Sequence, residues 1–121
     1  MAALNEGRHT AEFLVSEANG NRSRDVVTIA NGAAYEPGTV LGQVTASGKY
    51  KPHAAGASDG TQNAAAVLYD AADASEGDAD AVIIARDAEV ALGAISFASG
   101  ISQANKATAI AALADNGIVA R

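Results

Sequence analysis

Short apolar runs separated by turn-forming residues fill the first hundred positions of the chain. Such runs, bounded by Gly, Pro, Asn or Asp, are typical of β-strands. Pro37-Gly38 fits the centre of a type II turn, and Gly42 interrupts an alternating segment as a β-bulge does. Pro52 is expected at a sheet edge, because proline cannot donate a ladder hydrogen bond. The pattern predicts a mainly β domain with strands at 25–30, 39–46, 49–53, 64–70 and 81–97, the last as one bent strand or as two joined near Arg86-Asp87.

The end of the chain changes to an alanine-rich composition with high helix propensity. One C-terminal helix is expected at about 102–115, with Ser102 as the N-cap and Gly117 as the C-terminal stop. Its apolar positions are mostly small, which predicts close contact with the domain's own sheet or with a second subunit. These positions are Ile101, Ala104, Ala107, Ile110, Ala111, Leu113 and Ala114.

Residues 1–24 lack a regular pattern and are predicted to form an extended N-terminal arm, while 25–121 form the β-rich domain. Turn-favouring residues gather at 19–23, and Phe13-Leu14-Val15 is the one apolar interruption. This run is long enough for a strand but has no hairpin partner nearby in the sequence. Either it adds to the sheet edge of another chain, or it folds back as an edge strand of its own domain.

The composition indicates a thin hydrophobic core. Alanine supplies 31 of the 59 apolar residues, against 22 Val, Ile and Leu and two Phe. Burial free energy scales with apolar area, so alanine contributes little, and thin cores are often completed by oligomerisation. The net charge of −6 disfavours nucleic-acid binding, and the absence of cysteine excludes disulfides. Without a signal peptide or an apolar run that could span a bilayer, the protein is expected to be made in the cytoplasm, with no membrane partner.

The histidines and carboxylates of the sequence do not predict a metal site. The two histidines, His9 and His53, lack the spacing of a zinc site. The carboxylates at 70–80 do not follow the order of an EF-hand loop, so a solvated acidic loop is expected. These carboxylates are Asp70, Asp73, Glu76, Asp78 and Asp80.

Catalytic motifs are also missing from the sequence, and neither an enzyme nor a cofactor is predicted. A hydrolase would have to combine Ser58, His53 and Asp59, which stand in no recognised motif. A lipoyl-type carrier would modify Lys49 in the tight turn at 47–49, but its neighbours do not match that family. The alternatives to a structural role are therefore a small β-barrel carrier or ligand-binding module of a cytoplasmic complex and, less favoured, a hydrolase.

Extended similarity gives a more specific hypothesis. Over roughly 7–121 the chain resembles the head decoration proteins of lambda-like tailed bacteriophages, most specifically in "EFLVSEANGNRSRD" and "TVLGQVTASGKY". The stretch "AVIIARDAEV" and the ending "NGIVAR" also resemble that family. Many relatives carry a Trp-Pro pair before the C-terminal helix, where this chain has "ISFASG" at 95–100. Phe97 is the candidate to replace that aromatic packing.

The resemblance implies a β-clip-type domain that assembles as a homotrimer on the outer surface of the virion, after synthesis in the cytoplasm of the host bacterium. Such trimers sit at three-fold and quasi-three-fold positions of an expanded capsid. They clamp neighbouring subunits of the major capsid protein and resist the pressure of packaged DNA. In such proteins the N-terminal segment tends to order only on the shell.

An arm of this kind is predicted to bind the capsid by strand addition, with affinity from backbone hydrogen bonds. Burying three large apolar side chains gains roughly 5–8 kcal/mol, while ordering the backbone costs about 1 kcal/mol or more per residue. One arm should therefore bind poorly, whereas three arms on a trimer gain ~10²–10⁴ through avidity. The predicted capsid-binding residues are Glu12, Phe13, Leu14, Val15, Arg22 and Arg24.

Overall fold

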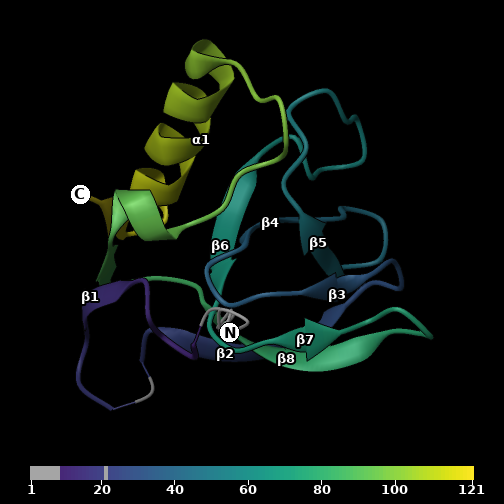
Figure 1. Cartoon of the computed structure of the whole chain (residues 1–121), viewed down its shortest axis with the longest axis horizontal. Coiled ribbons are helices and arrows are strands. Elements are labelled where there is room, and N and C mark those ends of the chain that lie inside the picture. Colours follow the sequence, from purple (N-terminus) through teal and green to yellow (C-terminus); the bar gives the residue numbers. More distant parts are fainter. Residues whose placement is uncertain (1–8, 21) are drawn as a thin grey trace, which may run out of the picture.

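The computed structural model describes residues 9–20 and 22–121. Within this part of the chain, short strands surround a small core and one α-helix lies near the C-terminus (Figure 1), which confirms the predicted fold class. The β-clip type stays a prediction. The elements are β1 (Leu14–Glu17), β2 (Arg24–Ile29), β3 (Ala34–Tyr35), β4 (Val40–Gln43), β5 (Tyr50–Pro52), β6 (Ala64–Leu68), β7 (Ala72–Asp73), β8 (Ala79–Ile84), β9 (Ala88–Val90), the 3₁₀ helix η1 (Leu92–Ala94), α1 (Gln103–Asp115) and β10 (Ile118–Ala120).

Five strands close into a barrel in the order β2-β5-β4-β6-β8. The prediction that Pro52 lies at a sheet edge is wrong, because β5 pairs with β4 on one side and with β2 on the other. The pairing with β2 is the single pair Ile29–Tyr50, so the missing N–H of Pro52 costs no bond to β2. A two-stranded sheet of β3 and β7 lies beside the barrel. Apolar side chains pack together in a first core inside the barrel: Ile29, Leu41, Ala66, Leu68, Ala72, Ala74, Ala81 and Ile83.

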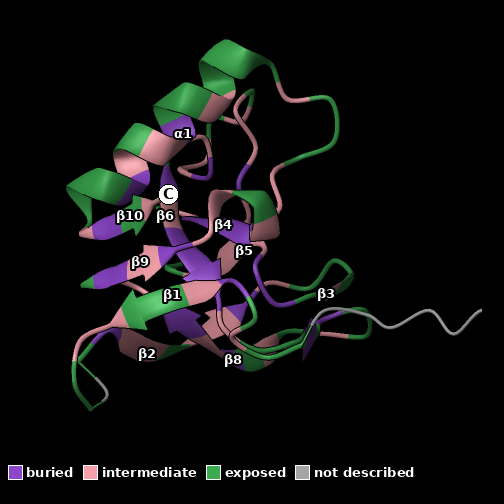
Figure 2. Cartoon of the chain, turned by 60° about the vertical axis from the view of Figure 1, so that its left-hand side comes forward, coloured by how far each residue is buried: buried purple, intermediate pink, exposed green. Residues whose placement is uncertain are grey.

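A second layer covers one side of the barrel. It consists of the sheet β1-β9-β10 and of α1, which packs on β6 and β10 (Figure 2). β1 runs antiparallel to β9, and β10 runs parallel to it. Strand residues that alternate with those of the first core point into this layer, because successive side chains of a strand face opposite sides. The second core contains Phe13, Val40, Ala64, Val67, Ile84, Ala88, Val90, Ile95, Ala109, Leu113 and Ile118.

The turn and the bulge predicted around β4 are confirmed. Gly38 has φ +91° and the Thr39 N–H donates to the Glu36 carbonyl at 3.3 Å, as in a type II turn. The ladder between β4 and β6 shifts register at Gly42. A Cβ on Gly42 would lie 2.6 Å from the Cα of Thr61, so glycine is required by the close approach of the 54–63 loop.

The region 81–97 forms two strands rather than one bent strand. β8 belongs to the barrel and β9 to the second layer, so the chain changes sheets between them. Asp87 has φ +53° at this corner, a left-handed conformation that aspartate tolerates better than most residues. The change of direction therefore lies at the predicted position. β10, which pairs with β9, was not among the predicted strands.

The predicted helix is confirmed, and only part of its predicted apolar face packs on the domain's own sheet; contact of the rest with a second subunit stays a prediction. The Ser102 hydroxyl accepts a hydrogen bond from the Asn105 N–H, and Gly117 has φ +84° just after the helix. Ala109 and Leu113 are the buried residues of α1, and Ile110 is half-buried. Four of the small residues of the predicted apolar face are exposed, because α1 meets the sheet through a narrow stripe: Ala104, Ala107, Ala111 and Ala114.

The predicted boundary between arm and domain also needs correction. β1 and the first residue of β2 are strands of the domain's own sheets, so residues 9–20 and 22–24 belong to the folded unit rather than to a separate arm. Residues 1–8 of the predicted arm lie outside the described residues.

Gly60 provides a test of the packing of the 54–63 loop. It has φ +110°, and a Cβ there would lie 2.4 Å from the Gln43 carbonyl oxygen and from Thr45 Oγ1. We expect Gly60→Ala to lower the free energy of unfolding by about 1–3 kcal/mol, measured by denaturant titration. Gly56→Ala is the control, because nothing lies within 4 Å of its Cβ position. Equal stability of the two variants would contradict the described loop.

Candidate functional site

Phe13 is packed inside its own chain. Its side chain is 1% exposed and contacts the second core, between the barrel and α1. The Ala91 N–H donates to the Phe13 carbonyl at 2.7 Å, and Leu14 lies opposite Val90. The prediction that Phe13-Leu14-Val15 packs on another chain is therefore wrong for Phe13 and for Leu14, which also packs against this core. The alternative, an edge strand of the same domain, is what the structure shows.

The scarcity of large apolar residues explains this placement. The second core combines three alanines with medium-sized aliphatic residues, and Phe13 is the largest side chain buried in it. A strand near the N-terminus thus supplies volume that an alanine-rich helix cannot, and close packing of the interior requires that volume.

Arg24 is also used within the domain. Its guanidinium forms an ion pair with Glu17, with Nε donating to Oε2 at 3.1 Å and Nη2 donating to Oε1. It lies 4.2 Å from the centre of the Tyr69 ring, and the Ser23 hydroxyl donates to Glu17 Oε2 at 2.5 Å. The hydrogen bond from Arg24 lowers the pKa of Glu17, and the same bond raises the pKa of Arg24. This cluster fastens β1 to β2, so Arg24 is not free for a partner's carboxylate.

Three of the six predicted capsid-binding residues lie at the surface. Glu12 and Arg22 are exposed, and Val15 on β1 is 56% exposed. Arg22 forms a long ion pair with Asp87, with 3.6 Å between Nε and Oδ2. Exposed pairs of this kind contribute little stability, so Arg22 can exchange partners. We call Glu12, Val15 and Arg22 the N-terminal surface.

A shallow hollow of about 290 Å³ lies over β2 and β8, a feature that sequence patterns did not reveal. Its lining contains two opposed valines, Val26 on β2 and Val82 on β8, together with Arg24 and Asp25. Val26 is 74% exposed, and Asp25 Oδ2 accepts a hydrogen bond from Arg86 at 2.5 Å. The alternating pattern of β2 predicts that one side of the strand faces outward, but not that it carries a bare valine.

The residues considered for a hydrolase do not form a catalytic arrangement. His53 is 2% exposed and its Nε2 bonds to the Gln62 carbonyl at 3.1 Å. The Asp59 carboxylate accepts a hydrogen bond from the Thr61 hydroxyl at 2.6 Å and pairs with Lys51 at 2.9 Å. The Thr61 hydroxyl, followed by Lys51, holds the pKa of Asp59 far below its usual range. These contacts organise the loop after β5 rather than activate a serine.

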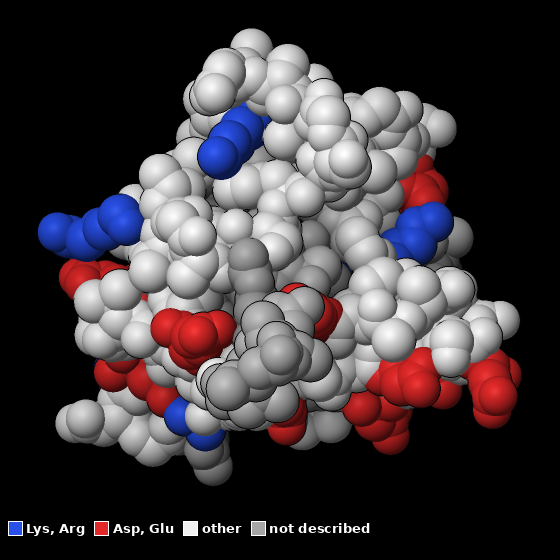
Figure 3. Space-filling view, in the orientation of Figure 1, with Lys and Arg blue, Asp and Glu red and all other residues white. Residues whose placement is uncertain are grey.

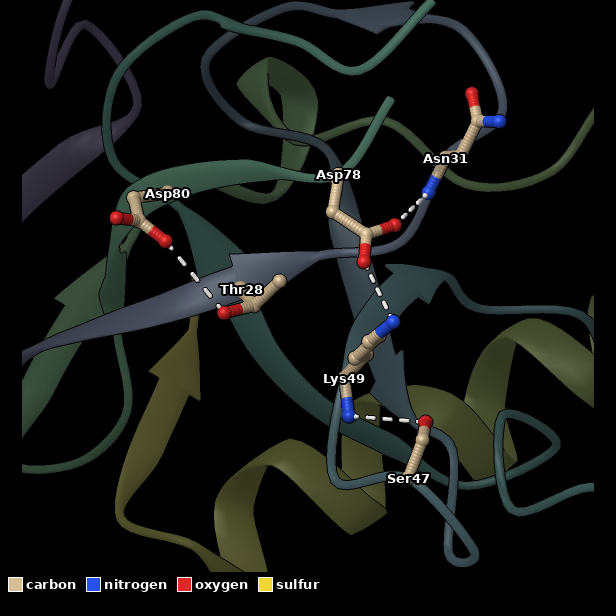
Figure 4. Close-up of polar contacts among 6 residues, drawn as sticks. All are labelled: Thr28, Asn31, Ser47, Lys49, Asp78 and Asp80. Atoms are coloured by element: carbon tan, nitrogen blue, oxygen red, sulfur yellow. Dashed lines mark hydrogen bonds and ion pairs between the residues drawn. The ribbon is translucent and has the colours of Figure 1, made fainter. Parts of the chain in front are cut away.

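Lys49, the residue of the carrier hypothesis, joins two loops instead of standing alone in a turn. Figure 4 shows its ammonium group donating to Asp78 Oδ2 at 2.5 Å, while Asp78 Oδ1 accepts a hydrogen bond from the Asn31 N–H at 2.8 Å. The hydrogen bond from Lys49 lowers the pKa of Asp78. On the neighbouring strands, the Thr28 hydroxyl donates to Asp80 at 3.5 Å.

The acidic segment lies along one side of the molecule. Figure 3 shows acidic side chains gathered near β7 and β8. Two of them make local contacts: Asp73 accepts hydrogen bonds from Ser75, and Asp70 accepts one from the Ala71 N–H. Asp70 also accepts a hydrogen bond from the distant Thr10 hydroxyl. Within the described ranges, no group of three or more His, Cys, Asp or Glu residues is placed to hold a metal ion. In the same residues, no helix is long and apolar enough to cross a membrane.

Phe97, the candidate for the missing aromatic pair, packs against the second core at the start of the segment leading to α1. The Lys106 ammonium group lies 5.3 Å from the centre of its ring. Main-chain hydrogen bonds from Ser96 to Gly38 and from Val40 to Ser96 attach this segment to the barrel.

Comparison with protein families gives a match to a family of known function. The family model described as bacteriophage lambda head decoration protein D matches residues 3–118, nearly the whole chain. A search of curated proteins gives no match.

Phe13→Ala distinguishes packing in the domain from packing on a partner. If Phe13 fills the second core, the substitution should lower the free energy of unfolding of the free protein by about 3–5 kcal/mol, measured at fixed protein concentration. Val15→Ala, two residues away on the exposed side, should change it by less than about 0.5 kcal/mol. If Phe13→Ala left the free energy of unfolding unchanged, Phe13 would not fill the second core, and packing on a partner would be favoured again.

Glu17→Gln tests the ion pair through its pH dependence. The pKa of Glu17 in the folded protein is below its ordinary value of 4.5, because Arg24 hydrogen-bonds the carboxylate. The ion pair therefore contributes its full stability at pH values above the ordinary pKa of 4.5. This contribution is lost as the pH falls through the lower pKa that Glu17 has in the folded protein. Denaturant titrations should show a wild-type advantage near neutral pH that shrinks on acidification. An advantage that grew on acidification would contradict the pairing.

Proposed function

Because the chain belongs to the family of the bacteriophage lambda head decoration protein D, a structural protein of the phage capsid, we propose that it binds the outer surface of the expanded head as trimers. There it clamps neighbouring subunits of the major capsid protein and stabilises the shell against the pressure of packaged DNA. The observation that carries this proposal is the match over residues 3–118, which covers both layers of the fold.

The structure offers support for association with other subunits. Nineteen hydrophobic residues form the buried core of the described chain, and seven of them are alanines. Three valines stand exposed on strands: Val15, Val26 and Val119. A small core combined with exposed apolar strand residues fits a domain that gains stability from neighbours.

Two hydrogen bonds attach the N-terminal segment to the domain. The Thr10 hydroxyl donates to Asp70 Oδ1 at 2.6 Å, and the Ala11 N–H donates to the Tyr69 carbonyl at 3.1 Å. The proposed arm is therefore the segment before His9, with Glu12 close behind its root in the sequence and Arg22 beyond the far end of β1. In the proposal, the residues of the N-terminal surface make the first contacts with the major capsid protein.

The shorter arm makes the trimer more important. With Phe13 and Leu14 committed to the second core, one arm has less apolar surface to bury on a partner. A single contact is then weaker than a long arm would give, since burial of apolar area supplies most of the free energy. Three linked contacts can still bind firmly, because the second and third form at a high effective concentration.

Deletion of residues 2–8 tests the arm without disturbing the core. We expect this variant to fold and form trimers like the full chain, but to bind expanded shells more weakly. Because avidity multiplies the loss of each contact, the loss of affinity should be at least about tenfold and can reach ~10². Cosedimentation with shells and light scattering of the free protein provide the two measurements. A deletion of 2–24 is unsuitable, because it also removes β1 and Phe13.

The matched control replaces residues 2–8 with a Gly/Ser segment of equal length. If this variant binds like the deletion, the side chains of the arm carry the contact; if it binds like the full chain, length alone matters. A deletion variant that saturates shells at the same concentration as the full chain would exclude the arm from capsid binding.

A further inference from the structure

The sequence contains three Asn-Gly pairs, at 19–20, 31–32 and 116–117. In such a pair the backbone nitrogen of glycine can attack the side-chain carbonyl carbon of asparagine. Ammonia leaves and a five-membered succinimide forms, which water then opens to aspartate or isoaspartate. The attacking nitrogen must lose its proton and approach the side chain, so a hydrogen bond that holds the glycine N–H suppresses the reaction. The fold therefore decides which pair reacts.

Two of the pairs are held. The Gly32 N–H donates to the Ala74 carbonyl at 2.9 Å, and the Asn31 N–H donates to Asp78. At the end of α1, the Gly117 N–H donates to the Ala114 carbonyl at 2.9 Å. The side-chain amide of Asn116 there donates to the Ala65 carbonyl at 3.2 Å. Either pair must open locally before its nitrogen can attack.

The third pair is exposed and open. Asn19 and Gly20 are exposed in the loop between β1 and β2, at the lower left of Figure 1. Among the described residues, no atom accepts a hydrogen bond from the Gly20 N–H. Nothing lies within 4 Å of the position that a Cβ of Gly20 would occupy, apart from its neighbours in the chain.

We propose that Asn19 is a site of spontaneous modification, at which the Gly20 nitrogen displaces ammonia and water opens the ring to aspartate or isoaspartate. Asn31 and Asn116 stay intact in the folded protein. The reaction needs only water besides the chain itself. Each event exchanges a neutral amide for a carboxylate, and the isoaspartate product also lengthens the backbone of the loop by one carbon.

The new charge would lie in a loop whose two ends already stand near carboxylates, Glu17 and Asp87. The loop's anchors are the bond from the Ala18 N–H to the Asp87 carbonyl at 2.9 Å and the Ser23–Glu17 hydrogen bond. Arg22, in the same loop, pairs with Asp87 at 3.6 Å. A carboxylate at position 19 competes for Arg22, so modification weakens shell binding; this last step rests on the proposed function, whereas the chemistry does not.

Peptide mass spectrometry of the full chain tests the chemistry within one molecule. After incubation of the folded protein in mildly alkaline buffer, trypsin separates the three pairs into peptides 9–22, 25–49 and 107–121. Fragmentation distinguishes Asn19 from Asn21 in the first of these. We expect deamidation at Asn19 at least about tenfold faster than at Asn31 or Asn116, a ratio that corresponds to about 1.4 kcal/mol of local opening. Similar rates at the three sites in the folded protein, or a faster rate at Asn31 or Asn116, would overturn the proposal.

Unfolding provides the control for sequence effects. In concentrated urea the hydrogen bonds to Gly32 and Gly117 are lost, so the three rates should converge. A preference for Asn19 that persisted unchanged in urea would mean that the fold plays no part, and would overturn the structural argument.

Asn19→Asp and Asn31→Asp separate this proposal from the proposed function. Both variants add one carboxylate, but only the first places it in the same loop as Arg22, so only Asn19→Asp should bind expanded shells more weakly. If Asn19 deamidates selectively while both variants bind normally, the modification stands and its link to the capsid fails. If Asn19 stays intact, the modification is refuted whatever the shell binding shows.

Discussion

The insertion of Phe13 between the barrel and α1 is the contact on which the arrangement of the second layer depends. Barrel strands turn Val40, Val67 and Ile84 toward this layer, and the helix offers only Ala109 and Leu113 in return. The gap between them is closed by an aromatic ring from the far N-terminal side of the chain. Since protein interiors tolerate few voids, β1 must lie against β9 for the two layers to pack.

That requirement limits what the N-terminal region can do for a partner. A side chain that fills the domain's own core cannot also insert into a capsid subunit without exposing that core. In our proposal, binding is therefore assigned to the segment before His9 and to the N-terminal surface of Glu12, Val15 and Arg22. The segment before His9 starts from a fixed point on the domain, because Thr10 and Ala11 are hydrogen-bonded to it. Weak single contacts from a fixed root are the situation in which multivalency has most effect.

Local signals in the sequence predicted most of the elements, and long-range contacts account for the errors. The turn at Pro37-Gly38 and the helix from Ser102 to Gly117 depend on neighbours in the sequence, so their residues were sufficient to place them. β1 pairs with a strand more than seventy residues later, and β10 pairs parallel to that same strand. No pattern within either segment identifies such a partner. The fold class could thus be read from the sequence, while the use of Phe13 could not.

The same reasoning applies to the predicted site. Arg22 and Arg24 look equivalent in the sequence, since both follow a turn and both are basic. The fold separates them, because Arg24 is the first residue of β2 and reaches Glu17 and Tyr69, whereas Arg22 stays in the exposed loop. One arginine therefore serves stability and the other is available for binding.

Charge pairing shows what kind of surface the domain offers to a partner. Of the seven basic residues in the described chain, six form ion pairs with carboxylates and Lys106 lies over Phe97: Arg22, Arg24, Lys49, Lys51, Arg86 and Arg121. With these cations engaged and a net charge of −6, the surface of the described residues presents little free positive charge to attract an acidic partner. Exposed ion pairs are weak, so exchange of a single pair such as Arg22–Asp87 costs little. In our proposal, attachment to a shell depends mainly on apolar area, backbone contacts and repetition, and Arg22 adds the one charged contact that can exchange partners. An added carboxylate in the loop of Arg22 acts on the one cation of the N-terminal surface.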